Sequence, residues 1–208
     1  IMVHESAGHP YEADRILGRE AAQAGESFVT KGMLGKRIGS EVVNVVDDPT
    51  LKNSYGYYLY DDEGVPARRR FLMKDGIINE FLHNRETAAE MGVSSNGAAR
   101  ASGFDREPLV RMGNTFMLPG DYTFEELVEN IQLGVYIKTF GEWNIDDRRY
   151  NMRFVGRECY LIEKGDVRGM IHRPILELTT PGFYGSIDAL DRSLTFEGAT
   201  CGKGDPGQ

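Results

Sequence analysis

The fold of this chain is indicated most clearly by residues 68–82, which read RRRFLMKDGIINEFL. Two runs of strand-forming residues, 68–74 and 77–82, flank the dipeptide Asp75-Gly76. Aspartate and glycine tolerate the positive φ angles of a two-residue turn, so this pattern is typical of a β-hairpin. We therefore predict two antiparallel strands here.

Most of the remaining chain also has the pattern of strands, short helices and loops. The expected strands are residues 41–46, 109–118, 135–140, 152–163 and 167–178, the last two joined by Lys164-Gly165-Asp166. The expected helices are part of residues 5–24, then 86–91 ending at Gly92, 123–132 beginning with a Thr-x-x-Glu capping box, and 186–190. Residues 1–3 resemble the end of a buried strand, and 27–40 and 94–102 resemble loops. This mixture predicts an α+β fold on a mostly antiparallel, curved sheet with a few helices.

The composition is that of an ordinary globular domain. The 208 residues are 40% hydrophobic and 27% charged, which fits one domain with its own core. The net charge of -8 argues against nucleic acid as a partner, because a phosphate-binding face shows as a basic excess. The apolar runs are too short to cross a membrane. With two cysteines, Cys159 and Cys201, and no signal peptide, we expect a reducing compartment, the cytoplasm.

The hexapeptide HESAGH, which begins at His4 and ends at His9, carries the clearest chemical signal. Neutral imidazole is a good zinc donor, and a glutamate beside the first histidine is placed to take a proton from an attacking water. The five-residue spacing would point the two imidazoles about 140° apart on an ideal helix. Gly8 permits unusual dihedral angles and Pro10 lacks an N–H group. We therefore predict a π-type bulge from Ala7 to Pro10, which would bring both imidazoles to one ion.

The pattern leaves the third ligand open. The candidates, near and far in sequence, are Glu12, Asp14, His83, Cys159, His172 and Cys201. Cys201 lies in a glycine-rich loop that can bend toward a metal, and a thiolate is a strong zinc ligand. Cys159 is expected to be a small buried hydrophobe in a strand, and the two distant histidines are expected to be structural or solvent-facing.

Several motifs together resemble the TldD/PmbA family, sometimes called modulators of DNA gyrase, and within it the TldD-like, metal-bearing branch. The hexapeptide resembles the family's HExxxH, and Glu12 and Asp14 resemble its following E-x-D. The other matching segments run the length of the chain in order; they are residues 61–66 (DDEGVP), Met91-Gly92 with Asn96-Gly97 and Arg100, residues 111–120 (RMGNTFMLPG), residues 160–165 (YLIEKG), and Cys201-Gly202-Lys203 with Gly207-Gln208.

The resemblance implies a zinc-dependent peptidase that acts on small or unfolded peptides. It implies that His4, His9 and Cys201 hold the zinc ion and that Glu5 is the general base. It also implies a dimer, formed either by two copies or by this chain and a metal-free PmbA-like paralogue. The chain opens without an initiator Met and reaches its motif at once. We therefore expect residues 1–208 to be a fragment, the C-terminal metallopeptidase domain, with the metal-motif helix at its N-terminal end.

The sequence departs from the family pattern at Pro10 and Ala13, where the family has glycines, and in a longer loop after Cys201. Arg100 and Arg111 are candidates for a second electrophile, with a structural salt bridge as the plainer interpretation of each. Two other functions stay open. The chain could be a metal-containing binding or regulatory subunit without hydrolysis, or an interaction module whose two motif histidines are structural.

Overall fold

The hairpin predicted at residues 68–82 forms strands β2 (Arg70–Lys74) and β3 (Ile77–Ile78) in the computed structural model, which describes residues 1–19 and 27–203. The turn residues Asp75 and Gly76 have φ angles of 49° and 74°, as this hairpin type requires. The hairpin continues into a four-stranded sheet in the order β3-β2-β1-β6, with β1 at Val45–Asp47 and β6 at Thr115–Met117. Each neighbouring pair in this sheet is antiparallel.

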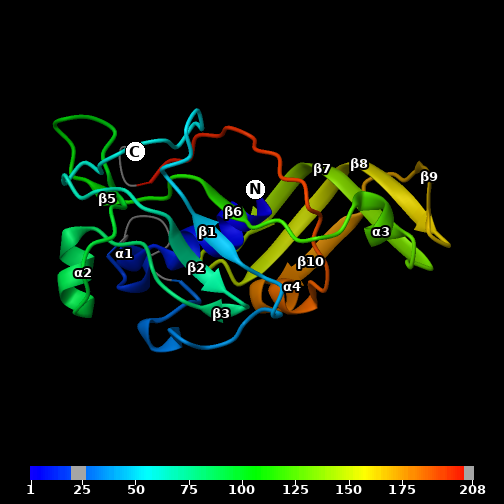
Figure 1. Cartoon of the computed structure of the whole chain (residues 1–208), viewed down its shortest axis with the longest axis horizontal. Coiled ribbons are helices and arrows are strands. Elements are labelled where there is room, and N and C mark those ends of the chain that lie inside the picture. The colour runs from blue at the N-terminus through cyan, green and yellow to red at the C-terminus, as the bar shows by residue number, and fades with distance from the viewer. Residues whose placement is uncertain (20–26, 204–208) are drawn as a thin grey trace.

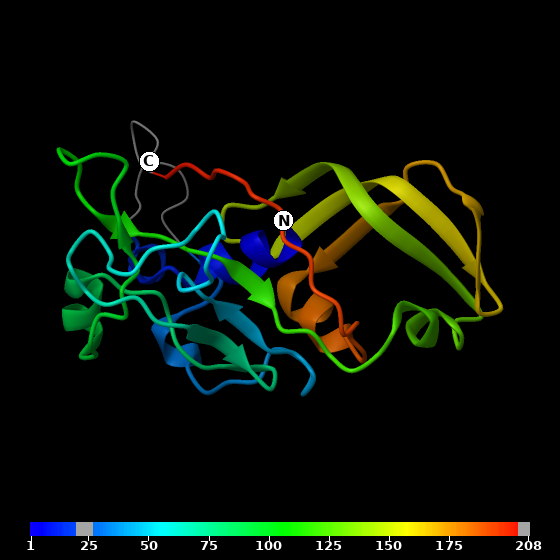
Figure 2. The same ribbon diagram turned by 45° about the horizontal axis from the view of Figure 1, so that its top comes forward.

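A second sheet forms an elongated arm on the other side of the molecule (Figure 1). Its order is β10-β8-β7, with β9 also paired to β8, and every pair is antiparallel. The strands are β7 (Leu133–Ile145), β8 (Asn151–Glu163), β9 (Asp166–Met170) and β10 (Ile175–Thr179). Register shifts interrupt the long β7–β8 ladder, and such bulges bend a sheet, which accounts for the curve of the arm in Figure 2.

Helices are short and lie around the first sheet and at the ends of the arm. The N-terminal run consists of a π-helix (His4–Gly8), a 3₁₀-helix (His9–Tyr11) and α1 (Ala13–Ile16). The others are a 3₁₀-helix (Lys31–Met33), α2 (Arg85–Met91), α3 (Phe124–Val128) and α4 (Thr180–Ser186). A two-stranded sheet pairs β4 (Ala99–Arg100) with β5 (Leu109–Val110). This architecture confirms the predicted α+β class with antiparallel sheets and a few helices.

The core lies between the first sheet and the N-terminal helical run. Ala7, Tyr11 and Ala13 are completely buried there, together with Leu72 and Ile78 of the hairpin. The helical run is therefore a fixed part of the core, and it holds the HESAGH motif against the sheet.

Several expected boundaries were wrong for reasons that the tertiary structure explains. Residues 109–118 form two strands, because the backbone N–H of Gly113 turns to donate to the Asp47 carboxylate at 2.9 Å. Residues 167–178 also form two strands, separated by residues 171–174, which include Pro174, a residue without an N–H group for a ladder. The last helix is Thr180–Ser186 rather than 186–190, because the Thr179 side chain caps it at its start.

Smaller differences concern the lengths of elements. Residues 2 and 3 begin a helical turn rather than end a strand, since Glu5 N donates to Ile1 O. The capping box of Thr123 and Glu126 is confirmed, although the helix ends at Val128. The first predicted strand is shortened to Val45–Asp47, the strand at 135–140 extends to both sides, and the loops 27–40 and 94–102 contain a 3₁₀-helix and β4. Residues 20–24 of the predicted helical stretch lie outside the described residues.

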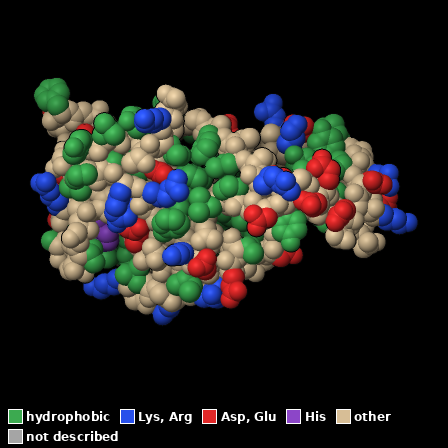
Figure 3. Space-filling model, viewed as in Figure 1, with side chains coloured by type: hydrophobic (Ala, Val, Ile, Leu, Met, Phe, Trp, Pro, Cys, Tyr) green, Lys and Arg blue, Asp and Glu red, His purple; other side chains and the backbone are tan. Residues whose placement is uncertain are grey.

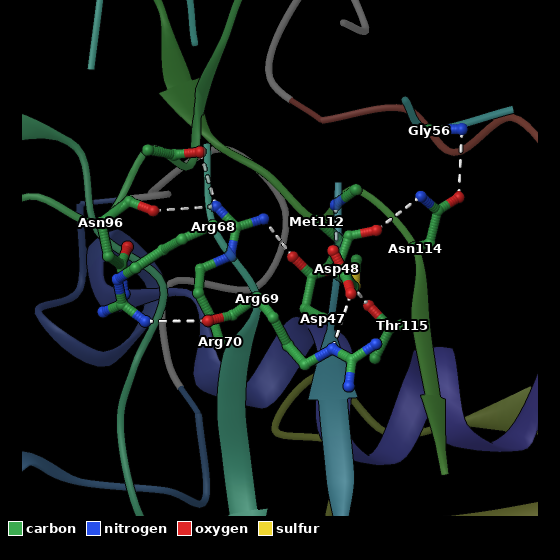
Figure 4. A network of polar contacts seen from close by, with 12 residues as sticks. Asp47, Asp48, Gly56, Arg68, Arg69, Arg70, Asn96, Met112, Asn114 and Thr115 are labelled. Carbon is green, nitrogen blue, oxygen red and sulfur yellow. Dashed lines mark hydrogen bonds and ion pairs between the residues drawn. The ribbon is translucent and has the colours of Figure 1, made fainter. Parts of the chain in front are cut away.

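A buried ion pair ties the first sheet to the loops above it (Figure 4). The side chains of Asp47 on β1 and Arg70 on β2 pair with each other, and both are completely buried. Arg70 also donates to the carbonyl oxygens of Asn96 and Gly97, and Asp47 accepts from Thr115 Oγ1 at 3.0 Å. The Arg70 contacts fix the loop before β4, and the Asp47 contacts, together with the one from Gly113 N, fix the turn between β5 and β6, which carries residues of the site described below.

The molecular surface carries mixed charges. On the face shown in Figure 3, basic and acidic side chains are interspersed, and the basic ones do not gather into one patch. Within residues 1–19 and 27–203, the helices are all too short and too polar to cross a lipid bilayer.

Candidate metal centre

The HESAGH motif adopts a π-helical turn. The backbone N–H of His9 donates to the carbonyl oxygen of His4, a bond that spans five residues instead of the four of an α-helix. The wider turn places both imidazoles on one side, with ring centroids 4.7 Å apart in an edge-to-face arrangement. The predicted π-type turn is therefore present, but it spans His4–Gly8, and Pro10 lies in the 3₁₀-helix that follows.

The role of Gly8 differs from the expected one. Its φ angle is −81°, which any residue can adopt, so the turn does not need the conformational freedom of glycine. What the position lacks is space, because an added Cβ atom would collide with Sδ of Met112 in the β5–β6 turn. Gly8 therefore lets the motif helix pack directly against that turn.

Cys201 completes a group of three possible metal ligands. Its Sγ atom lies 3.2 Å from Nε2 of His9, and the ligand atoms of His4, His9 and Cys201 all lie within 4.8 Å of one another. In the part of the chain that the structure describes, this is the one group of at least three His, Cys, Asp or Glu side chains with such spacing. The structure thus brings together the three residues that the family resemblance implied, and their role as ligands stays a prediction.

The distant candidates lie elsewhere. Cys159 is completely buried in β8, as expected for a small hydrophobe, and its thiol contacts none of the three. His83 is buried, with Nδ1 3.2 Å from Thr87 Oγ1. His172 is exposed between β9 and β10 rather than within a strand.

Glu12 contacts one member of this group directly, and Asp14 is linked to Glu12 through Lys203. Oε2 of Glu12 lies 3.0 Å from Nδ1 of His9, the ring nitrogen opposite the one that faces Cys201. A carboxylate in this position fixes the tautomer and orientation of a ligand histidine. Burial disfavours the Glu12 carboxylate, but Lys203, His9 and Arg111 outweigh it and hold its pKa well below the ordinary range. Asp14 pairs with Lys203 at 2.7 Å.

The electrostatics of the group favour a thiolate. Burial alone would raise the pKa of the Cys201 thiol, but hydrogen bonds from His4, His9 and Arg111 lower it to about 5. Burial likewise disfavours a charged His9, yet the Glu12 carboxylate and the Cys201 sulfur raise the pKa of this imidazole to about 9. At neutral pH the metal-free pair is therefore a thiolate beside a protonated imidazole, and a metal that binds here would displace the imidazole proton.

The three side chains fit a zinc ion. Imidazole nitrogen and thiolate sulfur are donors that zinc prefers, and three protein ligands leave one position for water or substrate. Zinc bonds of about 2.1 Å to nitrogen and 2.3 Å to sulfur at a tetrahedral angle separate the two donors by about 3.6 Å. The distance of 3.2 Å between His9 Nε2 and Cys201 Sγ is close to this value.

Glu5 faces an arginine that the sequence did not reveal as a site residue. Nε of Arg149, in the turn between β7 and β8, lies 3.2 Å from Oε2 of Glu5, and both side chains are mostly buried. The two arginines that were candidate electrophiles have structural partners. Arg111 donates to Cys201 O and to Glu12. Arg100 donates to Met112 O, and its guanidinium lies over the Tyr58 ring. No local pattern marks Arg149, because its contact depends on how the arm folds back.

The chain is similar to several known proteins. Residues 1–203 match the family model described as the PmbA/TldA metallopeptidase C-terminal domain. A metalloprotease of Methanocaldococcus jannaschii is 36% identical over 203 residues, which are 98% of this chain and 43% of that protein. A protein of Saccharolobus solfataricus named zinc metalloprotease TldD homolog is 29% identical over 206 residues, 98% of this chain and 44% of that protein. The chain spans less than half the length of these relatives.

Solved structures with higher sequence divergence share the fold. TldE from Thermococcus kodakarensis aligns with a TM-score of 0.77 at 19% identity, over 92% of this chain and 42% of that one. A Thermotoga maritima protein described as a candidate modulator of a DNA gyrase aligns with a TM-score of 0.75 at 23% identity, over 91% of this chain and 41% of that one. At these identities the likeness concerns the fold alone.

Proposed function

This chain belongs to the PmbA/TldD family of metallopeptidases, and we propose that it forms the metal-bearing C-terminal domain of a zinc-dependent peptidase that hydrolyses short or unfolded peptides. The observation that carries the proposal is the convergence of His4, His9 and Cys201 within 4.8 Å, with Glu5 in the same turn as His4. The names of the relatives, metalloprotease and zinc metalloprotease, support the same reaction class.

In this proposal His4, His9 and Cys201 hold Zn²⁺. When bound, zinc supplies a Lewis acid that polarises a peptide carbonyl and makes a coordinated water more acidic. Glu12 holds the His9 ring by its Nδ1 atom, which leaves Nε2 facing Cys201 and available to a metal. Metal binding would release a proton from His9, whose pKa is raised to about 9, whereas the Cys201 sulfur, with a pKa of about 5, has none to lose at neutral pH.

Glu5 is the proposed general base. Its carboxylate takes a proton from the attacking water and passes it to the leaving amine as the peptide bond breaks. Glu5 is not among the three grouped ligands, so its carboxylate is not committed to the metal. Arg149 holds one carboxylate oxygen, Oε2, and thereby fixes the direction in which the other one points.

The decisive variant is Glu5→Gln, which keeps the size of the side chain and removes the base. We expect zinc binding to persist at about one ion per chain and peptide cleavage to fall by about 10²- to 10⁴-fold. The matched control is Glu63→Gln. Glu63 lies in a turn and accepts from Arg85 N at 2.8 Å, so this variant should cleave peptides at the wild-type rate. Undiminished cleavage by Glu5→Gln would remove Glu5 from the mechanism.

Metal content tests the ligand set separately. Elemental analysis of protein purified without affinity-tag metals should give about one zinc per chain, and Cys201→Ser should lose or strongly weaken it. Zinc that is unchanged in Cys201→Ser would assign the third position to Glu12 or Asp14. Zinc bound without cleavage in every assay would favour the alternative function, a metal-containing binding or regulatory subunit.

For the whole protein, we propose that a dimer encloses the active sites and admits flexible peptides only. A flexible peptide should be cleaved while its folded parent is spared, if a dimer of two copies, or of this chain and a metal-free PmbA-like paralogue, encloses the sites. Mass spectrometry of products from a peptide and from the folded protein that contains it tests this point. Equal cleavage of both would exclude an enclosed site.

A further inference from the structure

The C-terminal segment, residues 187–203, carries Cys201 to the metal group across an otherwise exposed path. It leaves α4, and its carbonyl at Asp191 accepts from Gly120 N at 2.9 Å. Figures 1 and 2 both show the segment, in red, crossing back toward the part of the molecule that holds β1 and β6. Residues 192–200 are exposed along this crossing. Along the crossing Phe196 packs edge-to-face against Phe116, and Thr200 Oγ1 lies 3.1 Å from the Tyr55 hydroxyl. These contacts are open to solvent, so a buried contact at the far end of the segment would hold Cys201 more firmly.

Lys203 is that anchor. Only 1% of its surface is exposed, and its Nζ atom lies 2.7 Å from Asp14 Oδ1, 3.0 Å from Val110 O and 3.2 Å from Glu12 Oε2. A buried ammonium group is costly unless such partners surround it. Three acceptors from two separate parts of the core thus hold one side chain two residues after the candidate ligand.

The anchor and the candidate ligands share one carboxylate. Oε2 of Glu12 contacts Nζ of Lys203 and also Nδ1 of His9, at 3.2 and 3.0 Å. The backbone of the ligand residue is held as well, because Arg111 donates to Cys201 O at 2.6 Å and lies 3.4 Å from Glu12 Oε1. One buried cluster thereby fixes both sides of the pair formed by His9 and Cys201.

We propose that Lys203 is a positioning residue for the metal centre, whose ion pairs with Asp14 and Glu12 hold the sulfur atom of Cys201 within reach of His4 and His9. The part of this inference that concerns metal rests on the proposed function. The part that concerns the segment does not, since it describes the protein before any metal binds.

Whether Zn²⁺ affinity rises or falls when Lys203 is replaced distinguishes a positioning role from a purely electrostatic one. Lys203 carries a positive charge close to a site for a cation, so its removal strengthens zinc binding if charge is its whole contribution. If Lys203 positions Cys201, its removal weakens zinc binding, because the third ligand is no longer held in place. We expect Lys203→Met to bind Zn²⁺ about 10- to 100-fold more weakly, as loss of an outer partner typically does.

The experiment measures Zn²⁺ affinity by competition with a chromophoric chelator, in parallel with cleavage of the metal-free protein by chymotrypsin. Leu194 and Phe196 are exposed in the crossing segment, and freeing its end should speed cleavage there severalfold. The matched control is Lys138→Met, an exposed lysine paired with Glu158 on the arm, which should change neither result. Circular dichroism confirms that each variant is folded.

A double variant guards against misfolding. Asp14→Asn combined with Lys203→Met removes one charge of each sign and should show the same loss of zinc affinity and faster cleavage. Zinc affinity within twofold of the wild type, or tighter, in either folded variant would overturn the positioning role. If the wild type itself bound no zinc, the proposed function would fail, and cleavage of the segment would still decide whether Lys203 anchors it.

Discussion

The guanidinium of Arg149 reaches from the β7–β8 turn to within 3.2 Å of the Glu5 carboxylate in the motif helix. Arg149 has a φ angle of 62°, a conformation that is uncommon for a residue with a side chain. The surrounding structure enforces it, because Thr180 Oγ1 donates to Arg149 O at 2.6 Å and Arg149 Nη1 donates to Asp146 O at 3.2 Å. Such enforced conformations cluster at functional sites.

Arg149→Gln should impair catalysis without removing the metal. Glu5 would lose the partner of Oε2, and a misdirected base lowers the rate by about 10- to 100-fold. Zinc content should stay at the wild-type level, because Arg149 contacts none of the three candidate ligands. Steady-state peptide cleavage and elemental analysis measure the two quantities. Arg168→Gln, an exposed arginine of β9 that pairs with Asp166, is the control, and a wild-type rate in Arg149→Gln would refute the role.

Gly8→Ala should destabilise the fold through Met112. The added Cβ overlaps Sδ of Met112, and overpacking of this kind costs about 1–3 kcal/mol. Gly185→Ala in α4 is the control, because nothing lies near its added Cβ, and it should be neutral or slightly stabilising. A double-mutant cycle compares urea unfolding of Gly8→Ala, of Met112→Ala and of the double variant Gly8→Ala/Met112→Ala with that of the wild type. Additive effects in that cycle would mean that the two residues do not collide.

Asp47→Asn should be strongly destabilising. It leaves the fully buried Arg70 guanidinium without its anionic partner, and breaking a buried pair typically costs about 3–5 kcal/mol. Glu158→Gln breaks the pair with Lys138 on the arm, where solvent screens the charges, and should leave the unfolding free energy nearly unchanged. Equal effects in urea unfolding would contradict the assignment of the Asp47–Arg70 pair to the stable core.

His83 should make the protein acid-sensitive. Burial lowers the pKa of its imidazole from 6.5 to about 4, with Glu80 opposing the shift only weakly. His83 in the unfolded chain therefore binds a proton near pH 6.5, whereas in the folded chain it binds one only near pH 4. The free energy of unfolding consequently falls as the pH drops from 6.5 toward 4. At pH 5 this contribution is on the order of 2 kcal/mol.

His83→Asn should reduce that loss of stability between pH 7 and pH 5, because asparagine keeps a hydrogen-bonding group near Thr87 and does not titrate. His172→Asn changes an exposed histidine and should behave as the wild type. Urea midpoints at the two pH values give the comparison. The same acid sensitivity in His83→Asn and the wild type would assign it to other groups.

The elements that could be predicted from the sequence are those with local chemical signals. The turn at Asp75-Gly76, the glycine stop at Gly92 and the capping box at Thr123 depend on residues within a few positions of one another. The break in the strand at residues 109–118 depends on Asp47, which lies 66 residues before Gly113 in sequence, and no local rule contains it. Wrong boundaries therefore mark places where tertiary contacts decide the structure.

The candidate site divides in the same way. The spacing of His4, Glu5 and His9 is local, and it was enough to predict a π-type turn from residue geometry. Cys201 is 192 residues from His9, so its residue type made it one candidate among several, and the family resemblance singled it out. Arg149 was missed, since its approach to Glu5 is produced by the return of the β7–β8 hairpin to the core.

The hydrogen bond from His9 N to His4 O has a consequence for how such motifs can change in length. A π turn accommodates one additional residue without displacing the helix on either side. Removal of Ala7 would leave the order His-Glu-Ser-Gly-His, which is the four-residue spacing of the common zinc-peptidase helix. The two motif lengths thus differ by a single inserted residue. Because the π turn accommodates that residue, a helix can carry either motif and still direct both imidazoles to the same side.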